Sequence, residues 1–178
     1  MFKKIAIGLG AASLLAIAQA SWAGSTAVTL SVSASVTENC NVTNTATLAF
    51  GAYDPVSANA STPKNGTATI AMTCTKGANA VTIDVQNGSN FSSGSRRLKA
   101  SGSANFLNYA VYQPDTGGTT GCTSLSTAWV SGTPYAVPST AFTGVATPTN
   151  VSVCGQIPAG QDPVVDTYAD TVTVTVAF

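Results

Sequence analysis

Four cysteines are the residues of this 178-residue chain with the clearest chemical role: Cys40, Cys74, Cys122 and Cys154. An even number of thiols in an exported chain is typical of disulfide bonds. A zinc site is the rival interpretation, but the chain has no histidine and no Cys-x-x-Cys spacing to build one. Of the three possible pairings we prefer Cys40 with Cys74 and Cys122 with Cys154, because each joins near neighbours along the chain.

Catalytic chemistry finds little support in the sequence. No histidine is present to act as the general base of a hydrolase triad. Asp162, Asp166 and Asp170 could supply paired carboxylates, but they fall in a segment rich in proline and glycine, where solvated turn residues are the usual explanation. We therefore expect no enzyme activity, catalytic residue, cofactor or bound metal. A charged fraction of 8% without a basic excess also argues against nucleic acid as a partner.

The first 23 residues form the pattern of a cleaved secretory signal peptide. Lys3 and Lys4 precede an uncharged stretch, Ile5–Ala18, and small-x-small cleavage sites follow, the second of which ends at Ala23. The apolar stretch is shorter than the roughly 20 residues that a membrane-spanning helix needs. We therefore expect an exported chain that keeps no integral membrane segment after cleavage.

From residue 27 onward, apolar and polar side chains alternate with a period of two, which predicts half-buried β-strands. The alternating runs cover residues 27–36, 67–74, 81–85, 107–111 and 170–178. Three dipeptides are expected to form turns between runs: Asn65-Gly66, Asn87-Gly88 and Gly117-Gly118. Short strands at this spacing predict one antiparallel β-sandwich of the immunoglobulin-like class.

The alternating runs at the two ends, 27–36 and 170–178, allow two interpretations. Either both are ordinary strands of one closed sandwich, or the fold lacks a strand that another molecule supplies. Composition alone favours the first interpretation.

Five motifs between residues 39 and 178 follow one another in the order of a known family. They are Asn39–Val42 with Leu48–Asp54, Ile70–Gly77, Arg97–Leu98, Leu107–Tyr112 and Tyr168–Phe178. Together they resemble the spore coat protein U domain, a family that is similar to the pilin subunits of archaic (Csu-type) chaperone–usher pili. Cys122 and Cys154 are additions to the family pattern, and residues 117–150 match it poorly.

The resemblance implies an incomplete immunoglobulin-like antiparallel β-sandwich, completed by a donor strand from another subunit. Residues 1–23 are then a signal peptide, 24–37 an N-terminal donor-strand extension and 38–178 the pilin-like domain. The implied partners are copies of this chain or sibling pilin subunits, with a periplasmic chaperone and an outer-membrane usher during assembly. The implied function is that of a structural subunit of an extracellular pilus at the cell surface, polymerised by donor-strand exchange and supporting adhesion and biofilm formation.

The resemblance also implies which side chains make the contact between subunits. The donor strand would insert its apolar residues, Val28, Leu30, Val32, Ala34 and Val36. The last strand would border the acceptor groove with Val172, Val174, Val176 and Phe178, and the strand that starts near Cys40 would border it on the other side.

Two alternatives stay open at this point. A secreted spore or cell-envelope coat protein would share the fold without being assembled by an usher. A tip adhesin would need receptor contacts, for which Tyr53, Tyr112, Trp129 and Tyr135 could stack on sugars if they lie at the surface. Scattered aromatic residues are more often core or edge residues, so we expect no sugar site.

Overall fold

The computed structural model describes residues 24–43 and 46–178, so the predicted signal peptide lies outside the described residues. The chain divides into two units, 1–35 and 36–178. In the first unit, residues 24–35 form neither helix nor strand, and their side chains are exposed. No helix among the described residues is long and apolar enough to cross a membrane.

The regular secondary structure of the second unit is almost entirely β-strand. The strands are β1 (Cys40–Val42), β2 (Lys64–Cys74), β3 (Thr82–Val85), β4 (Arg96–Ala100), β5 (Phe106–Tyr112), β6 (Tyr135–Ala136), β7 (Thr149–Ile157), β8 (Tyr168–Ala169) and β9 (Val174–Ala177). A short helix, α1 (Ala58–Ser61), lies between β1 and β2, and a 3-10 turn, η1 (Ser139–Ala141), precedes β7.

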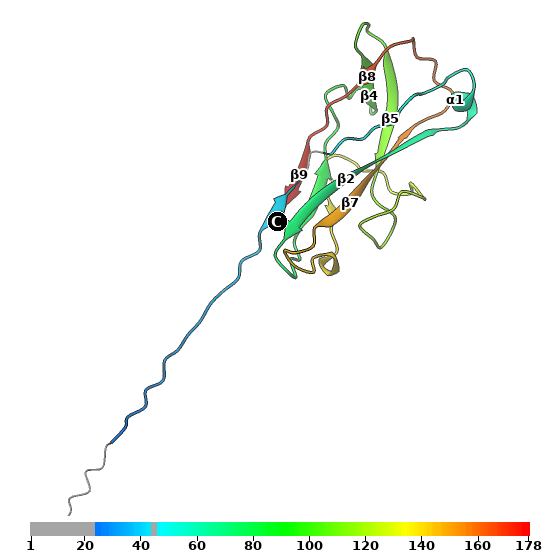
Figure 1. Cartoon of the computed structure of the whole chain (residues 1–178). Coiled ribbons are helices and arrows are strands. Elements are labelled where there is room, and N and C mark those ends of the chain that lie inside the picture. Colours follow the sequence, from blue (N-terminus) through cyan, green and yellow to red (C-terminus); the bar gives the residue numbers. More distant parts are fainter. Residues whose placement is uncertain (1–23, 44–45) are drawn as a thin grey trace, which may run out of the picture. The chain divides into compact units, whose positions relative to one another are not determined.

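The strands form two antiparallel sheets around one apolar core. The larger sheet has the order β1-β2-β7-β5-β4-β8, and the smaller sheet has the order β6-β3-β9. Figure 1 shows β2, β7 and β5 of the larger sheet side by side. Met72 and Val151 of the larger sheet and Ile83 of the smaller sheet are fully buried members of the same core cluster. The expected all-β antiparallel sandwich is therefore confirmed.

β2 shows how the alternating sequence pattern becomes one buried face. From Ala68 to Cys74, every second residue is buried, and the residues between them are exposed or half-buried. The expected turn at Asn65-Gly66 is wrong, because both residues lie inside β2 and pair with Gln156 and Gly155 of β7. An Asn-Gly pair favours a turn but does not compel one, and here continued pairing along β7 decides the conformation.

The C-terminal segment passes from one sheet to the other. β8 pairs with β4 in the larger sheet, whereas β9 pairs with β3 in the smaller sheet. The run 170–178, expected as one strand, therefore forms a regular ladder only over β9, because residues 170–173 cross between the sheets. β8 and β9 each lie at an edge of their sheet.

Two disulfide bonds fasten parts of the chain that have few ladder hydrogen bonds of their own. Cys40–Cys74 joins residues directly opposite each other on β1 and β2. Cys122–Cys154 joins the long connection between β5 and β6 to β7. These are the two pairs that we preferred from the sequence. The bonded residues are 34 and 32 positions apart, and closing loops of that size stabilises a fold by roughly 3–4 kcal/mol in the chain-entropy model.

Candidate functional site: an open groove between the two sheets

Residues 46–52, called the rim segment below, form one side of a groove. Its side chains alternate as in a strand, with Leu48 and Phe50 half-buried and their neighbours exposed. Before the rim segment, the Thr43 N–H donates a hydrogen bond to β2 (2.9 Å), and after it the Tyr53 hydroxyl donates to the turn that follows β7 (3.0 Å). Between these anchors, no backbone group of the rim segment hydrogen-bonds to another residue of the described ranges. Residues 46–50 of the rim segment therefore have unused backbone donors and acceptors, whereas Gly51 has a left-handed φ of 69°.

Residues 163–174 form the opposite side of the groove. The Gln86 N–H donates to the Thr173 carbonyl oxygen (2.9 Å), so Thr173 directs its backbone toward the continuation of β3. Neighbouring residues of a strand direct their backbone groups to opposite sides. Val172 and Val174 therefore present their N–H and C=O groups at the open edge of the smaller sheet.

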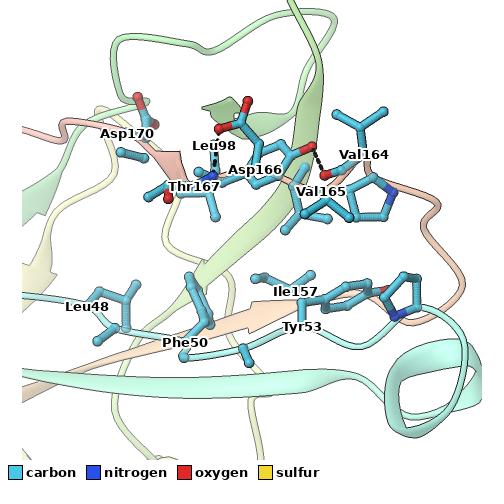
Figure 2. A pocket seen from close by; sticks show the side chains of 18 of the residues that line it. Leu48, Phe50, Tyr53, Leu98, Ile157, Val164, Val165, Asp166, Thr167 and Asp170 are labelled. Atoms are coloured by element: carbon cyan, nitrogen blue, oxygen red, sulfur yellow. Dashed lines mark hydrogen bonds between the residues drawn. The ribbon is translucent and has the colours of Figure 1, made fainter. Parts of the chain in front are cut away.

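Two adjoining cavities, of about 690 and 380 Å³, occupy the space between these two sides. The larger cavity has Leu107 and Ile157 of the larger sheet in its lining. Figure 2 shows Phe50 and Tyr53 across this cavity from the segment that carries Val164. The smaller cavity reaches the core, where it touches buried apolar residues of β2, β3, β5 and β7.

The cavities share Leu48, Phe50, Leu98 and Asp170 in their linings, so they are two parts of one groove. Its two sides run in opposite directions, because the rim segment passes the smaller cavity first and the C-terminal segment passes the larger one first. At about 3.3 Å per residue step, the run from residue 46 to residue 50 spans roughly 13 Å. The groove thus has the length and the two hydrogen-bonding edges that one additional β-strand requires.

Asp170 is the charged residue common to both cavities. Its carboxylate accepts hydrogen bonds from the Tyr109 hydroxyl (2.7 Å) and from the backbone and side-chain nitrogens of Asn90 (3.1 and 2.9 Å). Burial raises the pKa of Tyr109, and the hydrogen bond to Asp170 raises it further. A side chain on Gly88 would collide with this carboxylate. Asp170 is therefore held by donors of its own chain and is not the solvated turn residue expected from the sequence.

The predicted donor residues belong to exposed backbone without regular structure. Val28, Leu30, Val32 and Val36 are between 83% and 90% exposed, and Ala34 is exposed as well. The segment 24–37 contains no charged residue. A row of apolar side chains that its own chain leaves in water is a candidate for contact with another molecule.

The four residues predicted for the groove edge differ in position. Val172 and Val174 line the smaller cavity. Val176 packs against the core without lining a cavity, and Phe178 is 54% exposed. On the other side, the rim segment lines the groove in place of β1 itself. The sequence motif Leu48–Asp54 contained this information, since its alternating apolar residues are those that face the cavities.

The aromatic residues considered for sugar stacking do not gather on the surface. Trp129 is fully buried and packs edge-on against Tyr135, with 5.8 Å between the ring centroids. Trp129 is therefore not at the surface, where a sugar could stack on it. The reason is that its connection lies against the sandwich, where the backbone N–H of Trp129 donates to the Val111 carbonyl oxygen (2.8 Å).

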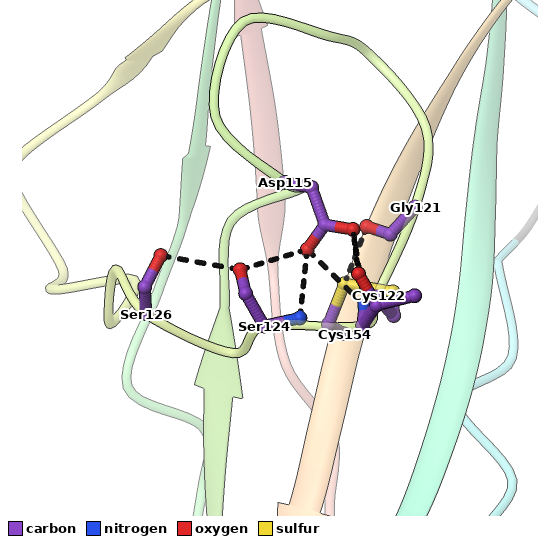
Figure 3. Close-up of a disulfide and its surroundings, with 7 residues drawn as sticks. Asp115, Gly121, Cys122, Ser124, Ser126 and Cys154 are labelled. Carbon is purple, nitrogen blue, oxygen red and sulfur yellow. Dashed lines mark hydrogen bonds between the residues drawn. A yellow bond between two sulfur atoms is a disulfide. The ribbon is translucent and has the colours of Figure 1, made fainter.

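Asp115 organises the same connection, which lies in the region that the sequence left without interpretation. Its carboxylate accepts hydrogen bonds from the backbone N–H groups and hydroxyls of Thr123 and Ser124, at 2.6–3.1 Å (Figure 3). The Thr123 hydroxyl is the largest of the causes that lower the pKa of Asp115 to about 2. The neighbouring Cys122–Cys154 bond ties this loop to β7.

Two antiparallel sheets with an open groove between them define an incomplete immunoglobulin-like β-sandwich. The chain belongs to the Spore Coat Protein U domain family, whose model matches residues 26–175. It is 33% identical to Protein U of Myxococcus xanthus over an alignment of 185 positions, gaps included, which covers 98% of this chain and 96% of that protein. It is also similar to a chain in the CsuC–CsuE chaperone–tip adhesion subunit pre-assembly complex from archaic chaperone–usher Csu pili of Acinetobacter baumannii. That similarity has 20% identity and a TM-score of 0.48, and it covers 80% of this chain and 40% of the other.

Proposed function

We propose that this chain is a structural subunit of an extracellular pilus, polymerised when residues 27–36 of one copy insert into the groove of the next. The observation that carries this proposal is that a single chain contains both surfaces that an inserted strand would bring into contact. One surface is a groove with two unpaired backbone edges, and the other is an exposed, uncharged segment with alternating apolar residues. Membership of the Spore Coat Protein U domain family is consistent with it.

The contact is a form of β-augmentation, in which backbone hydrogen bonds attach a strand and alternate side chains fill the space below it. The run from Val28 to Val36 spans roughly 27 Å when extended, which is enough to reach along the whole of residues 46–50. Burying three valines and a leucine contributes on the order of 6–10 kcal/mol before the cost of ordering the segment. Leaving the groove would expose both its edges and its apolar lining again, so we expect very slow dissociation.

The open groove also explains why the subunit would need help during export. Unpaired strand edges beside exposed apolar side chains promote aggregation. In the proposed pathway a periplasmic chaperone covers the groove, and an outer-membrane usher exchanges that cover for the extension of the next subunit. Surface adhesion and biofilm formation are the proposed uses of the resulting fibre.

The experiment compares two charge-matched variants of the exported chain. Leu30→Asp with Val32→Asp places two charges on the apolar face, whereas Thr29→Asp with Ser31→Asp places them on the hydroxyl face. On an unheated denaturing gel, the unmodified chain and the hydroxyl-face variant should give a ladder of multimers, and the apolar-face variant should remain monomeric. Equal ladders from both variants would exclude insertion by this face.

The second candidate is a secreted spore or envelope coat protein that is not assembled by an usher. The observation in its favour is the extent of the match to Protein U, which includes almost the full length of both chains. Co-expression distinguishes the two candidates. A pilus subunit should need the chaperone to accumulate in the periplasm, whereas a coat protein should accumulate equally well without it.

A further inference from the structure

Two glycines face each other across the ladder between β2 and β7. Gly66 of β2 is paired with Gly155 of β7. Both lie within regular strands, and neither has a left-handed φ angle. An L-residue could adopt either backbone conformation, so the conformation alone does not require glycine at these positions.

The space above the glycine pair is taken by the rim segment. A Cβ atom on Gly155 would lie 2.7 Å from Leu48 Cδ2 and 2.8 Å from Phe50 Cζ. A Cβ atom on Gly66 would lie 2.8 Å from the Ala49 carbonyl oxygen and 3.0 Å from Phe50 Cδ1. All four distances are shorter than ordinary van der Waals contact. Residues 48–50 therefore pack directly on the glycines, at a depth that a methyl group would prevent.

This packing matters because side-chain contacts hold the middle of the rim segment, and besides the glycines Phe50 packs edge-on against Tyr109, with 6.1 Å between the ring centroids. The segment is anchored before and after, but its own backbone forms no hydrogen bond to the rest of the described structure. Leu48 and Phe50 also line both cavities. Lifting these two side chains off β2 and β7 would move them into the space that an inserted strand would occupy.

We propose that Gly66 and Gly155 are positioning residues for strand insertion: by letting Leu48 and Phe50 sink onto the larger sheet, they keep the groove open. This inference rests on the proposed function, because it names what sets the width of the same groove. The glycines themselves touch the rim segment and act on an inserted strand only through it.

The test uses Gly155→Ala in the full exported chain, beside Phe50→Ala and the double variant Gly155→Ala/Phe50→Ala. Gly118→Ala is the matched control, since a Cβ atom there would meet its nearest neighbour at an ordinary 3.6 Å. Thermal unfolding establishes that each variant is folded. Fluorescence of an apolar dye, anilinonaphthalene sulfonate, reports the open groove of the monomer, and the unheated gel reports assembly.

We expect Gly155→Ala to lower the rate of multimer formation about tenfold or more and to reduce dye binding, because overpacking displaces neighbouring side chains. Removing the Phe50 ring relieves one of the two close contacts and leaves the one with Leu48, so the double variant should recover part of both readouts that Gly155→Ala loses. A purely destabilising effect of the alanine would instead persist or add in the double variant.

The two proposals can fail separately. Unchanged dye binding and assembly in Gly155→Ala, or a double variant no better than the single one, would overturn the role of the glycines. Dye binding that changes as expected, in chains that never form multimers, would support the glycines as determinants of groove width and overturn strand exchange.

Discussion

The hydrogen bond between Tyr109 and Asp170 offers a measurable test of how the groove is held together. Tyr109 is 6% exposed and lies on β5, and its hydroxyl donates to the Asp170 Oδ2 atom at 2.7 Å. The other carboxylate oxygen, Oδ1, accepts from Asn90. Tyr109→Phe removes one hydroxyl and leaves Oδ2 without its donor at the point where the C-terminal segment crosses between the sheets.

The expected loss is about 2 kcal/mol, because a hydrogen bond to a charged group contributes about 1.5–3 kcal/mol. In urea this loss corresponds to a midpoint lower by roughly 1 M, at a typical dependence near 2 kcal/mol per molar. The pH dependence of stability at alkaline pH gives a second measurement of the same hydrogen bond. The pKa of Tyr109 is raised in the folded state, so the folded state binds this proton more tightly, and its contribution is lost as pH rises above about 10. Tyr109→Phe should remove that part of the alkaline destabilisation.

The matched control is Tyr112→Phe, on the same strand. The Tyr112 hydroxyl forms no hydrogen bond to any residue in the described ranges, so its removal should change the free energy of unfolding by less than about 0.5 kcal/mol. Urea unfolding of the oxidised mature chain at neutral pH, followed by circular dichroism, compares the two. Equal midpoints for the two variants would refute the stabilising role assigned to the Tyr109–Asp170 bond.

Three further predictions concern groups away from the groove. The pKa of Asp115 is lowered to about 2 in the folded chain, so its contribution is present above about pH 4 and lost toward pH 2; Asp115→Asn should flatten the thermal stability profile over that range, and an unchanged profile would contradict this. Replacing Cys122 and Cys154 with alanine should lower the free energy of unfolding in urea by roughly 3–4 kcal/mol, and a loss below about 1 kcal/mol would show that the loop stays docked without the bond. Arg96→Lys should cost about 2–3 kcal/mol, because one planar guanidinium reaches three backbone carbonyl oxygens, two of them in buried hydrogen bonds; the same change at half-buried Arg97 should cost clearly less, and equal losses would argue against this role.

Local patterns in the sequence were sufficient to predict the structure where strand periodicity sets the neighbours of each residue. The alternation of β2 identified its buried face, and chain proximity identified the two cysteine pairs. The pattern could not reveal that Gly66 continues a strand, because the reason lies 89 positions away at Gly155, its partner in the ladder. Nor could it show that Trp129 is buried, since the connection that carries it has no regular period and is placed by tertiary contacts.

The incompleteness of the sandwich and its covalent links have a common physical basis. A sandwich that leaves a groove open gives up apolar burial along one side, and its stability must come from elsewhere. Cys40–Cys74 fastens the three-residue strand β1, whose ladder is short, directly ahead of the rim segment. On the connection between β5 and β6, Trp129 fills the core and Cys122–Cys154 holds the loop to β7. Neither disulfide nor Trp129 lines the cavities. Stabilising groups are thus placed where they leave the groove clear.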